Sequence, residues 1–574
     1  MNTGIRILLS LSIMASMAVA APIGITAPQA AVAATTQTKA MPATSTVYVN
    51  GQEMQSDLYT ISICKKVNAT DHYCDINDDL YVKLRDFAKT LQGTDKEFAV
   101  GYDSAKKKMN LLSGKAYKPV GGELKKTNSE SLQNAKPSDA GLLLDGQAAT
   151  ATAYTIKGST YYKLRDLCTI FKLPVSTRTY DNSIRIHTYG ELSTTLVAGN
   201  TLERSSVDYN YSNWFSPSKR FLYISGGQLQ VLEASETRSQ LIIHSFSSDY
   251  KELGQKKVPM ELPLFGGFHQ SQDGNYYVIY GQNNREDSDR KVVYRVVKYD
   301  NSWKKIAQVD ITDVYVSEPF HASNVTMDSY NDKLIIHSGR LRYLTDDGLR
   351  HQSNISFLID TKTMTVLEQP MNHVSHSFAT YVRFDGNRIV YVDHGDAWPR
   401  SIVLQVESNG GIEQTVDLIT FPGKLGDNYT GANLGGLEVA SLNDLIVGAD
   451  SGTKGTKNVF LSVVPKNAQQ SSDVKTIWLT NYTTKSSVRI KNQTHLVKLS
   501  DNKFVVMWEE LTEAGEPTVV YAVIDGSGSI IQKPKKLPGV PSPGNMMPLV
   551  QNGNLTWYYS QTTDLVEWYT LRIQ

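Results

Sequence analysis

The densest group of side chains able to bind a ligand lies in "DHGDAWPR", residues 393–400. It contains Asp393, His394, Asp396, Trp398 and Arg400. Carboxylates accept hydrogen bonds from sugar hydroxyls, and an indole can stack on a sugar ring. We therefore predict a ligand-binding loop here. A polar loop whose Trp-Pro pair only packs its base is the structural alternative.

Two histidines extend this candidate ligand-binding set. We expect His269 and His321 in connections between successive β-units, on the same face as the predicted loop. With His376 they could also be considered as metal ligands, but the histidines stand at unequal distances from their neighbouring turns. No metal site and no cofactor is therefore predicted.

Asp393, His394 and Asp396 could instead serve a glycan-active hydrolase or lyase. Glycosidases need two carboxylates about 5 to 10 Å apart beside the sugar, and spacing along a loop does not fix such a distance. The chain has neither a Gly-x-Ser-x-Gly nor a His-Glu-x-x-His motif. We assign no catalytic residue, and we favour a non-enzymatic protein.

A phrase that occurs twice indicates how the first part of the chain folds. "YVKLRDFAKTL" covers residues 81–91, and "YYKLRDLCTIF" covers residues 161–171. Apolar residues recur in each at the i, i+3, i+4, i+7 spacing of one helix face. They are Leu84, Phe87, Ala88 and Leu91 in the first copy, and Leu164, Leu167, Cys168 and Phe171 in the second.

The flanking sequence is also duplicated. "VYVNGQ" (residues 47–52) and "LLLDGQ" (residues 142–147) each predict a strand entering a tight turn, and each helix is followed by two short strands. Each copy thus predicts a small α+β unit: hairpin, helix, hairpin. We interpret the Arg-Asp pairs as charges at the helix start rather than as catalytic groups.

Residues 46–191 resemble a duplicated stalk domain, the module named after the N-terminal domain of copper amine oxidases. The resemblance rests on "NGQ…YTI…YVKLRDFAKTL…VGYD" and its second copy. It implies an exported protein of a Gram-positive bacterium, with the module as a spacer. Copper amine oxidase activity is rejected, because the chain lacks an Asn-Tyr-Asp/Glu cofactor precursor and a His-x-His copper pair.

The first copy contains an insertion, "CKKVNATDHYCDIND", with two of the three cysteines. In an exported protein we expect Cys64 and Cys74 to form a disulfide that closes a short loop. Cys168 occupies the helix position of Ala88 and is expected to be a buried free thiol. Asp75, Asn77, Asp79 and Asp86 have calcium-loop offsets, but Leu80 stands where that loop requires Gly.

From about residue 213, a polar turn followed by an apolar strand recurs at intervals of roughly 55 residues. Its first occurrence resembles the Ser-Pro-Asp-Gly turn of TolB-like and YVTN-type propellers. Together with further strand pairs, this repeat predicts a seven-bladed β-propeller over residues 213–574. The seven phrases are "SPSKRFLYISGG", "SQDGNYYVIYG", "YNDKLIIHSG", "FDGNRIVYVD", "LNDLIVGAD", "SDNKFVVMWE" and "QNGNLTWYYS".

The last repeat has three strands, so a propeller would need a fourth from elsewhere to cover its open edge. We predict that "ELSTTLVAG", near Leu192, supplies it. The expected organisation is a signal peptide (1–33), a linker (34–45), the stalk module (46–191), a linker with the closing strand (192–212) and the propeller (213–574). The fold class is therefore mainly β.

Composition limits the possible partners. The 574 residues carry 58 Lys and Arg against 57 Asp and Glu, which gives no electrostatic case for nucleic acid. Arg6 followed by "ILLSLSIMASMAVAA" is typical of a secretory signal, and no later run is long enough to span a bilayer. We expect a secreted or cell-wall-associated monomer that binds an extracellular glycan, cell-wall polymer or protein.

Overall fold

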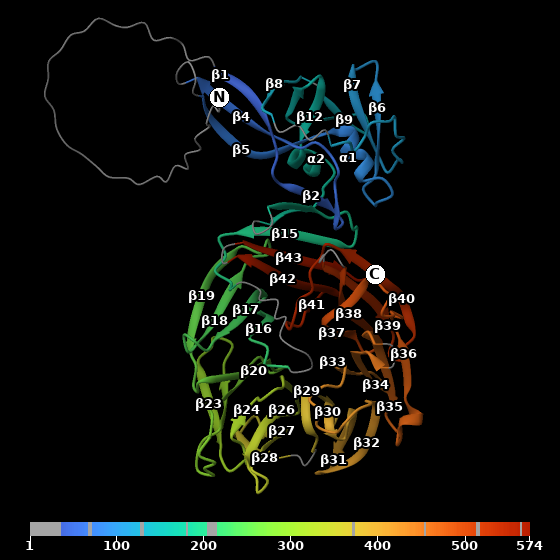
Figure 1. Ribbon diagram of the computed structural model, residues 1–574. Helices are drawn as coiled ribbons and strands as arrows, with labels where there is room; N and C mark the ends of the chain where they lie inside the picture. Colours follow the sequence, from blue (N-terminus) through green and yellow to red (C-terminus); the bar gives the residue numbers. More distant parts are fainter. Residues whose placement is uncertain are drawn as a thin grey trace, which may run out of the picture. The chain divides into compact units, whose positions relative to one another are not determined.

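The computed structural model describes residues 36–66, 72–126, 131–139, 141–178, 182–203, 215–369, 373–452, 455–512, 517–562 and 565–574 (Figure 1). The predicted signal peptide lies outside these residues. The fold is mainly β, and none of the described helices is long and apolar enough to cross a membrane. The chain divides into unit 1 (1–49, 53–173, 182–184) and unit 2 (50–52, 174–181, 185–574).

The predicted duplication is present in the order of the elements. Each copy contains an opening hairpin, two further strands, a helix and a closing hairpin. The first comprises β2 (Thr46–Val49), β3 (Gln52–Glu53), β4 (Tyr59–Lys66), β5 (His72–Lys83), α1 (Leu84–Thr90), β6 (Phe98–Asp103) and β7 (Lys108–Ser113). The second comprises β9 (Leu142–Leu144), β10 (Gln147–Ala149), β11 (Ala153–Ile156), β12 (Ser159–Lys163), α2 (Leu164–Ile170), β13 (Val175–Arg178) and β14 (Ser183–Ile186).

The two copies exchange their hairpins. The closing hairpin of one copy joins the opening hairpin of the other, in the sheet orders β10-β9-β7-β6 and β13-β14-β2-β3. Tyrosines at equivalent positions of the two copies also pack edge-to-face across the copies. The ring centroids of Tyr59 and Tyr161 are 5.1 Å apart, and those of Tyr81 and Tyr154 are 5.3 Å apart. The copies are therefore halves of one structure rather than two separate domains.

Both helices bury the predicted face. Phe87, Ala88, Leu167 and Cys168 are at most 1% exposed, and Cys168 is a free cysteine as predicted. Asp86, at the start of α1, accepts hydrogen bonds from the Ser56 hydroxyl (2.5 Å) and the Leu124 amide (3.1 Å). Asp86, the acid of the first Arg-Asp pair, therefore holds neighbouring segments against the start of α1, which is a structural rather than a catalytic role.

The expected linker over residues 34–45 is wrong. Residues Thr36–Pro42 form β1, which pairs with β4 along its whole length and with β8 (Gln133–Pro137) at Lys39 and Ala40. These strands complete a closed six-stranded barrel, β1-β4-β5-β12-β11-β8. The sequence of β1 is polar and lacks the alternating apolar residues that predict a strand. Backbone hydrogen bonds, rather than an apolar face, hold it in the barrel.

The cysteine insertion continues the β4–β5 hairpin rather than forming a separate loop. Cys64 and Cys74 lie directly opposite each other in the β4–β5 register. Their side chains, like those of Asp75 and Asn77, are outside the described part of the structure. The disulfide remains a prediction that the backbone register favours, since bridged cysteines need closely spaced Cα atoms.

The rest of unit 2 consists of antiparallel sheets. Four of them have four consecutive strands each: β16 (Arg220–Ser225), β17 (Gln228–Ser235), β18 (Gln240–Phe246) and β19 (Glu252–Pro259); β20 (Leu264–Gln270), β21 (Tyr276–Gly281), β22 (Tyr294–Tyr299) and β23 (Lys305–Ile311); β33 (Ala432–Val439), β34 (Asn443–Asp450), β35 (Asn458–Pro465) and β36 (Lys475–Trp478); and β37 (Val488–Ser500), β38 (Lys503–Thr512), β39 (Pro517–Ile524) and β40 (Ile530–Pro538).

The strands inside these sheets are buried on both faces. In β21, Tyr276, Val278 and Tyr280 belong to the core shared with the preceding sheet, whereas Tyr277 and Ile279 belong to the core shared with the following sheet. Side chains alternate between the faces of a strand. An unbroken run of large apolar residues therefore marks a strand packed between two sheets.

The third and fourth predicted units form one nine-stranded sheet. It contains β24 (Glu318–Pro319), β25 (Val325–Tyr330), β26 (Lys333–Leu344), β27 (Arg350–Asp360), β28 (Thr365–Glu368), β29 (Ser375–Asp385), β30 (Arg388–Trp398), β31 (Ser401–Ser408) and β32 (Gly411–Thr420). The two halves meet where Ser353 of β27 pairs with Ser375 of β29. β27 and β29 each have 11 residues, so they extend far enough to meet.

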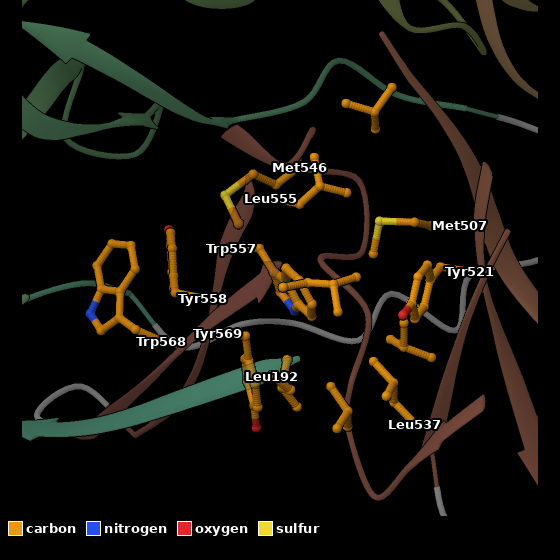
Figure 2. Close-up of a cluster of buried hydrophobic side chains, with 14 of the residues drawn as sticks. Leu192, Met507, Tyr521, Leu537, Met546, Leu555, Trp557, Tyr558, Trp568 and Tyr569 are labelled. Atoms are coloured by element: carbon orange, nitrogen blue, oxygen red, sulfur yellow. The ribbon is translucent and has the colours of Figure 1, made fainter. Parts of the chain in front are cut away.

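The predicted closing strand is present. β15 (Leu192–Ala198) pairs along its whole length with β43 (Leu565–Arg572), in the sheet β15-β43-β42-β41 (Figure 1). The other two strands are β41 (Leu549–Gln551) and β42 (Asn554–Thr562). Figure 2 shows Leu192 among Trp557, Trp568 and Tyr569 in a core that also includes residues of β17, β18 and β37–β40.

Candidate ligand-binding surface

The predicted loop at residues 393–400 is mainly strand. β30 continues to Trp398, and Asp393, His394 and Asp396 are fully buried. β29 pairs with β30 as far as Trp398 and β31 pairs with it as far as His394, so this segment is an inner strand of the sheet rather than a loop. Gly395 permits the close packing, because a Cβ atom there would lie 2.3 Å from the Pro399 carbonyl oxygen.

Asp393 is held inside the sheet. His337 Nε2 lies 3.0 Å from Asp393 Oδ2, and the Ser377 hydroxyl donates to Oδ1 at 2.7 Å. His337 and Ser377 are also fully buried. Both oxygens of this carboxylate thus have protein partners, and neither is available to a sugar.

His394 is equally enclosed. Its Nε2 lies 2.7 Å from the Thr430 hydroxyl oxygen, and burial lowers the imidazole pKa to about 3, helped by the positive charges of Lys457 and Arg400. The ring is therefore neutral at physiological pH. A neutral imidazole covered by protein is not placed to donate a proton to a substrate.

Asp396 connects two segments of chain. Its carboxylate accepts from the Arg400 guanidinium and, at 2.7 Å, from the Asn428 amide, while its carbonyl accepts from the Gly426 amide at 2.9 Å. Arg400 also donates to the carbonyl oxygen of Tyr429 at 2.9 Å. Residues 396–400 and 426–430 are consequently fixed side by side by charge-assisted hydrogen bonds.

This fixed base carries exposed apolar side chains. Trp398 is 68% exposed, Tyr429 59% and Leu425 44%. The peptide bond between Trp398 and Pro399 is cis. We call Trp398, Tyr429 and Leu425 the Trp398 surface. Of the residues predicted in this cluster, only Trp398 presents a largely exposed side chain, while Arg400 holds the neighbouring segment through Tyr429.

The two other predicted histidines lie apart from this cluster. His269 is inside β20, not in a connection, and its Nε2 contacts the Ser329 hydroxyl oxygen at 2.8 Å; burial lowers its pKa to about 4. His321 lies between β24 and β25, which both pair with β26 in one sheet, and so not in a connection between successive units; its Nδ1 is 3.2 Å from Glu318 Oε2. Among the described residues, no group of three or more His, Cys, Asp or Glu could hold a metal ion.

Sequence reasoning missed Tyr429 and Leu425. "GDNYTG" (residues 426–431) contains an Asn-Tyr pair without the acidic residue of an oxidase cofactor precursor, so that motif assigns it no role. An aromatic residue inside a turn rich in Gly, Asp and Asn was the available signal, since such turns display their side chains at the surface.

A hollow of about 150 Å³ lies between the β20–β21 and β25–β26 turns, lined by polar residues that include Ser271, Asp273, Ser329, Asp332 and Thr361. Ligand pockets usually have about 300–1,000 Å³. The hollow is too small to compete with the Trp398 surface as the main candidate site.

No family model and no curated protein matches the chain. One similar solved structure is titled "Crystal structure of polysaccharide lyase Uly1". It is 11% identical, with a TM-score of 0.38, and the match covers 67% of this chain and 99% of that one. A TM-score this low supports no conclusion about fold or activity.

Proposed function

We propose that the chain is a secreted or cell-surface binding protein whose recognition head is a seven-bladed propeller. The duplicated module would serve as its stalk or wall-proximal spacer. The leader-like sequence at the N-terminus and the "YVKLRD" and "YYKLRD" repeats support this proposal. Its ligand is an extracellular glycan.

Strand pairing supports the propeller. The nine-stranded sheet divides at the Ser353–Ser375 pair into two groups of strands. Together with the other five sheets that follow residue 191, these give seven groups of strands, one for each proposed blade. Successive groups share apolar cores, and the last core includes residues of both the first sheet and the closing sheet. Such cyclic packing with an early closing strand is typical of propellers.

The Trp398 surface is the observation that carries the binding proposal. Trp398 and Tyr429 are each exposed, on two segments that Asp396 and Arg400 fix side by side. Exposing large aromatic rings to water is unfavourable unless they bind something, and a rigid base removes much of the ordering cost of binding. Their flat faces suit the apolar face of a sugar ring.

A glycan array followed by calorimetry on the bound polysaccharide tests the proposal. We expect Trp398→Ala and Tyr429→Ala each to weaken binding at least tenfold, about 1.4 kcal/mol or more. Trp478→Ala is the matched control: Trp478 is 46% exposed on β36, outside the Trp398 surface. Equal weakening by all three variants would contradict a specific site.

A hydrolase or lyase acting at the same face is the second candidate. Both carboxylates it would use, Asp393 and Asp396, have protein partners, so no observation favours it. Polysaccharide turnover, measured in the same samples by reducing ends and by absorbance of unsaturated products, decides between them. Turnover that is lost in Asp396→Asn would overturn the binding-only proposal.

A further inference from the structure

The nine-stranded sheet places an arginine in line with Trp398. Arg340 of β26 lies opposite Ser353 of β27, Ser353 opposite Ser375 of β29, and Ser375 opposite Trp398 of β30. Neighbouring strands are about 4.8 Å apart, so Arg340 and Trp398 are separated by roughly 14 Å along one row. The junction of the two halves therefore brings these side chains onto one continuous sheet.

Arg340 is a largely enclosed cation without an anion. It donates to the Val314 carbonyl oxygen at 2.7 Å and to the Ser353 hydroxyl at 3.2 Å. No carboxylate lies within 4 Å of it among the residues that the structure describes. Burial lowers its pKa, and the neighbouring charge of Arg342 adds to the effect. Enclosed charges are normally paired, so Arg340 lacks an expected partner.

Arg342, two positions along β26, is a second cation without a carboxylate partner among the described residues. It donates to the His351 carbonyl oxygen at 3.4 Å, and in the described part of the chain it too has no carboxylate partner. Other cations nearby are paired: Arg350 with Asp287 at 2.6 Å, and Arg285 with Glu318 at 3.3 Å. Two unpaired guanidinium groups next to each other form a concentrated positive site.

His376 lies against the two segments that carry the Trp398 surface. Its Nδ1 lies 3.8 Å from Asp396 Oδ2, and its ring packs against Gly426, where an added Cβ atom would lie 3.3 Å from His376 Cε1. Burial lowers the pKa of His376, and so does the charge of Arg342. The ring is thus uncharged near neutrality.

We propose that Arg340 and Arg342 bind the acidic group of an anionic polysaccharide whose neighbouring sugar stacks on Trp398. The acidic group is a carboxylate or a sulfate, both of which match the planar guanidinium fork. This inference rests on the proposed function, because it names the class of glycan that the Trp398 surface would bind.

Calorimetry with polygalacturonate, dextran sulfate and neutral dextran tests the inference on the full-length protein. We expect a polyanion to bind more tightly than neutral dextran, and its affinity to fall at high salt. Arg342→Gln should weaken polyanion binding about tenfold or more and leave neutral dextran unchanged. Whichever polyanion shows the larger loss identifies carboxylate or sulfate as the bound group.

Arg285→Gln is the matched control, since it removes the same charge from a 75% exposed side chain that is paired with Glu318. Equal weakening by Arg285→Gln and Arg342→Gln would indicate diffuse attraction and overturn the inference. Arg340→Gln provides a second test, and its melting temperature shows whether it is folded.

The outcomes separate the two proposals. Polysaccharide binding that depends on Trp398 but not on Arg340 or Arg342 would sink the anion site and leave the proposed function intact. Without polysaccharide binding the proposed function fails. Inorganic sulfate then tests the cationic site itself, through the rise in melting temperature that sulfate causes relative to chloride at equal ionic strength. A smaller rise in Arg342→Gln than in the native protein would support the site. Identical rises would reject it.

Discussion

Leu192 lies directly opposite Leu571, in a sheet that combines one strand from before residue 200 with three from after residue 548. Both side chains are almost fully buried in the same core, together with Trp557 and Trp568. The last sheet of unit 2 is therefore incomplete without a segment that precedes all its other sheets in the sequence.

Leu192→Ala should destabilise unit 2 as strongly as a substitution in its interior. The side chain is 3% exposed, and burying a leucine of this kind contributes about 2–5 kcal/mol to the free energy of unfolding. Urea denaturation followed by tryptophan fluorescence measures the change. Leu442→Ala, at a 77% exposed position, should cost less than about 1 kcal/mol. Equal effects would contradict a closing role for β15.

Cys64 and Cys74 should form a disulfide in protein recovered from an oxidising compartment, because the β4–β5 register places them opposite each other. Peptide mapping without reduction should give one peptide pair linked through these residues. Cys168 should alkylate only after denaturation, because it is buried and burial raises its thiol pKa to about 12. Alkylation of both Cys64 and Cys74 without reduction would reject the bridge.

His244 should make the stability of unit 2 depend on pH. Its Nδ1 lies 2.9 Å from Glu252 Oε1, and its Nε2 lies 3.3 Å from Glu233 Oε2. Burial alone would lower the imidazole pKa, but the hydrogen bonds and charges of the two glutamates outweigh burial and raise it. The charged ring therefore stabilises the folded state.

A raised folded-state pKa gives stability that is fully present below the unfolded value of about 6.5 and is lost as pH rises through the folded value. The unfolding free energy of the native protein should therefore fall relative to that of His244→Gln as the pH rises from about 6 to 9. His351→Gln, which changes a surface histidine paired with Asp347, should leave the trend unchanged. A constant difference would show that folding does not raise the pKa of His244.

Asp444 should also make the stability of unit 2 depend on pH, because its pKa is higher in the folded state than in the unfolded chain. It is fully buried, and neither carboxylate oxygen has a hydrogen-bond partner in the described structure. Burial raises its pKa to about 7, and the charge of Asp385 adds to this. Between about pH 4 and 7 the folded protein thus holds a proton that the unfolded chain has released, and stability falls across this range.

Asp444→Asn removes this titration. The stability of the variant relative to the native protein should increase by on the order of 2–4 kcal/mol between pH 4 and pH 8. Asp385→Asn should weaken the effect, because it removes a negative charge that adds to the raised pKa of Asp444. A pH-independent difference for Asp444→Asn would mean that Asp444 is not protonated in the folded state.

The fold could be predicted in part because its signals are local and repeated. The apolar spacing around Phe87 and Leu167 marks both helices, and β15 was found by counting the strands of the last repeat. β1 and the junction at Ser353–Ser375 could not be found in this way. Each depends on backbone pairing between polar segments far apart in the sequence, and such pairing leaves no periodic pattern.

The candidate site was predicted less well. A run of Asp, His and Trp residues suggested an open loop, but the carboxylates of Asp393 and Asp396 are hydrogen-bonded to other protein groups. Burial of polar residues depends on which strands flank them, and this information lies in β29 and β31 rather than in residues 393–400. Only Trp398 kept its predicted exposure.

The pairing of β15 with β43 also determines when the last sheet of unit 2 can form during folding. During synthesis, residues 192–198 leave the ribosome long before residues 565–572, so the closing sheet cannot form until nearly all of unit 2 is available. Contacts this distant in sequence slow folding, and an unpaired strand edge favours association with other chains. A nascent chain of this protein therefore has a long interval in which a holding chaperone would be of use.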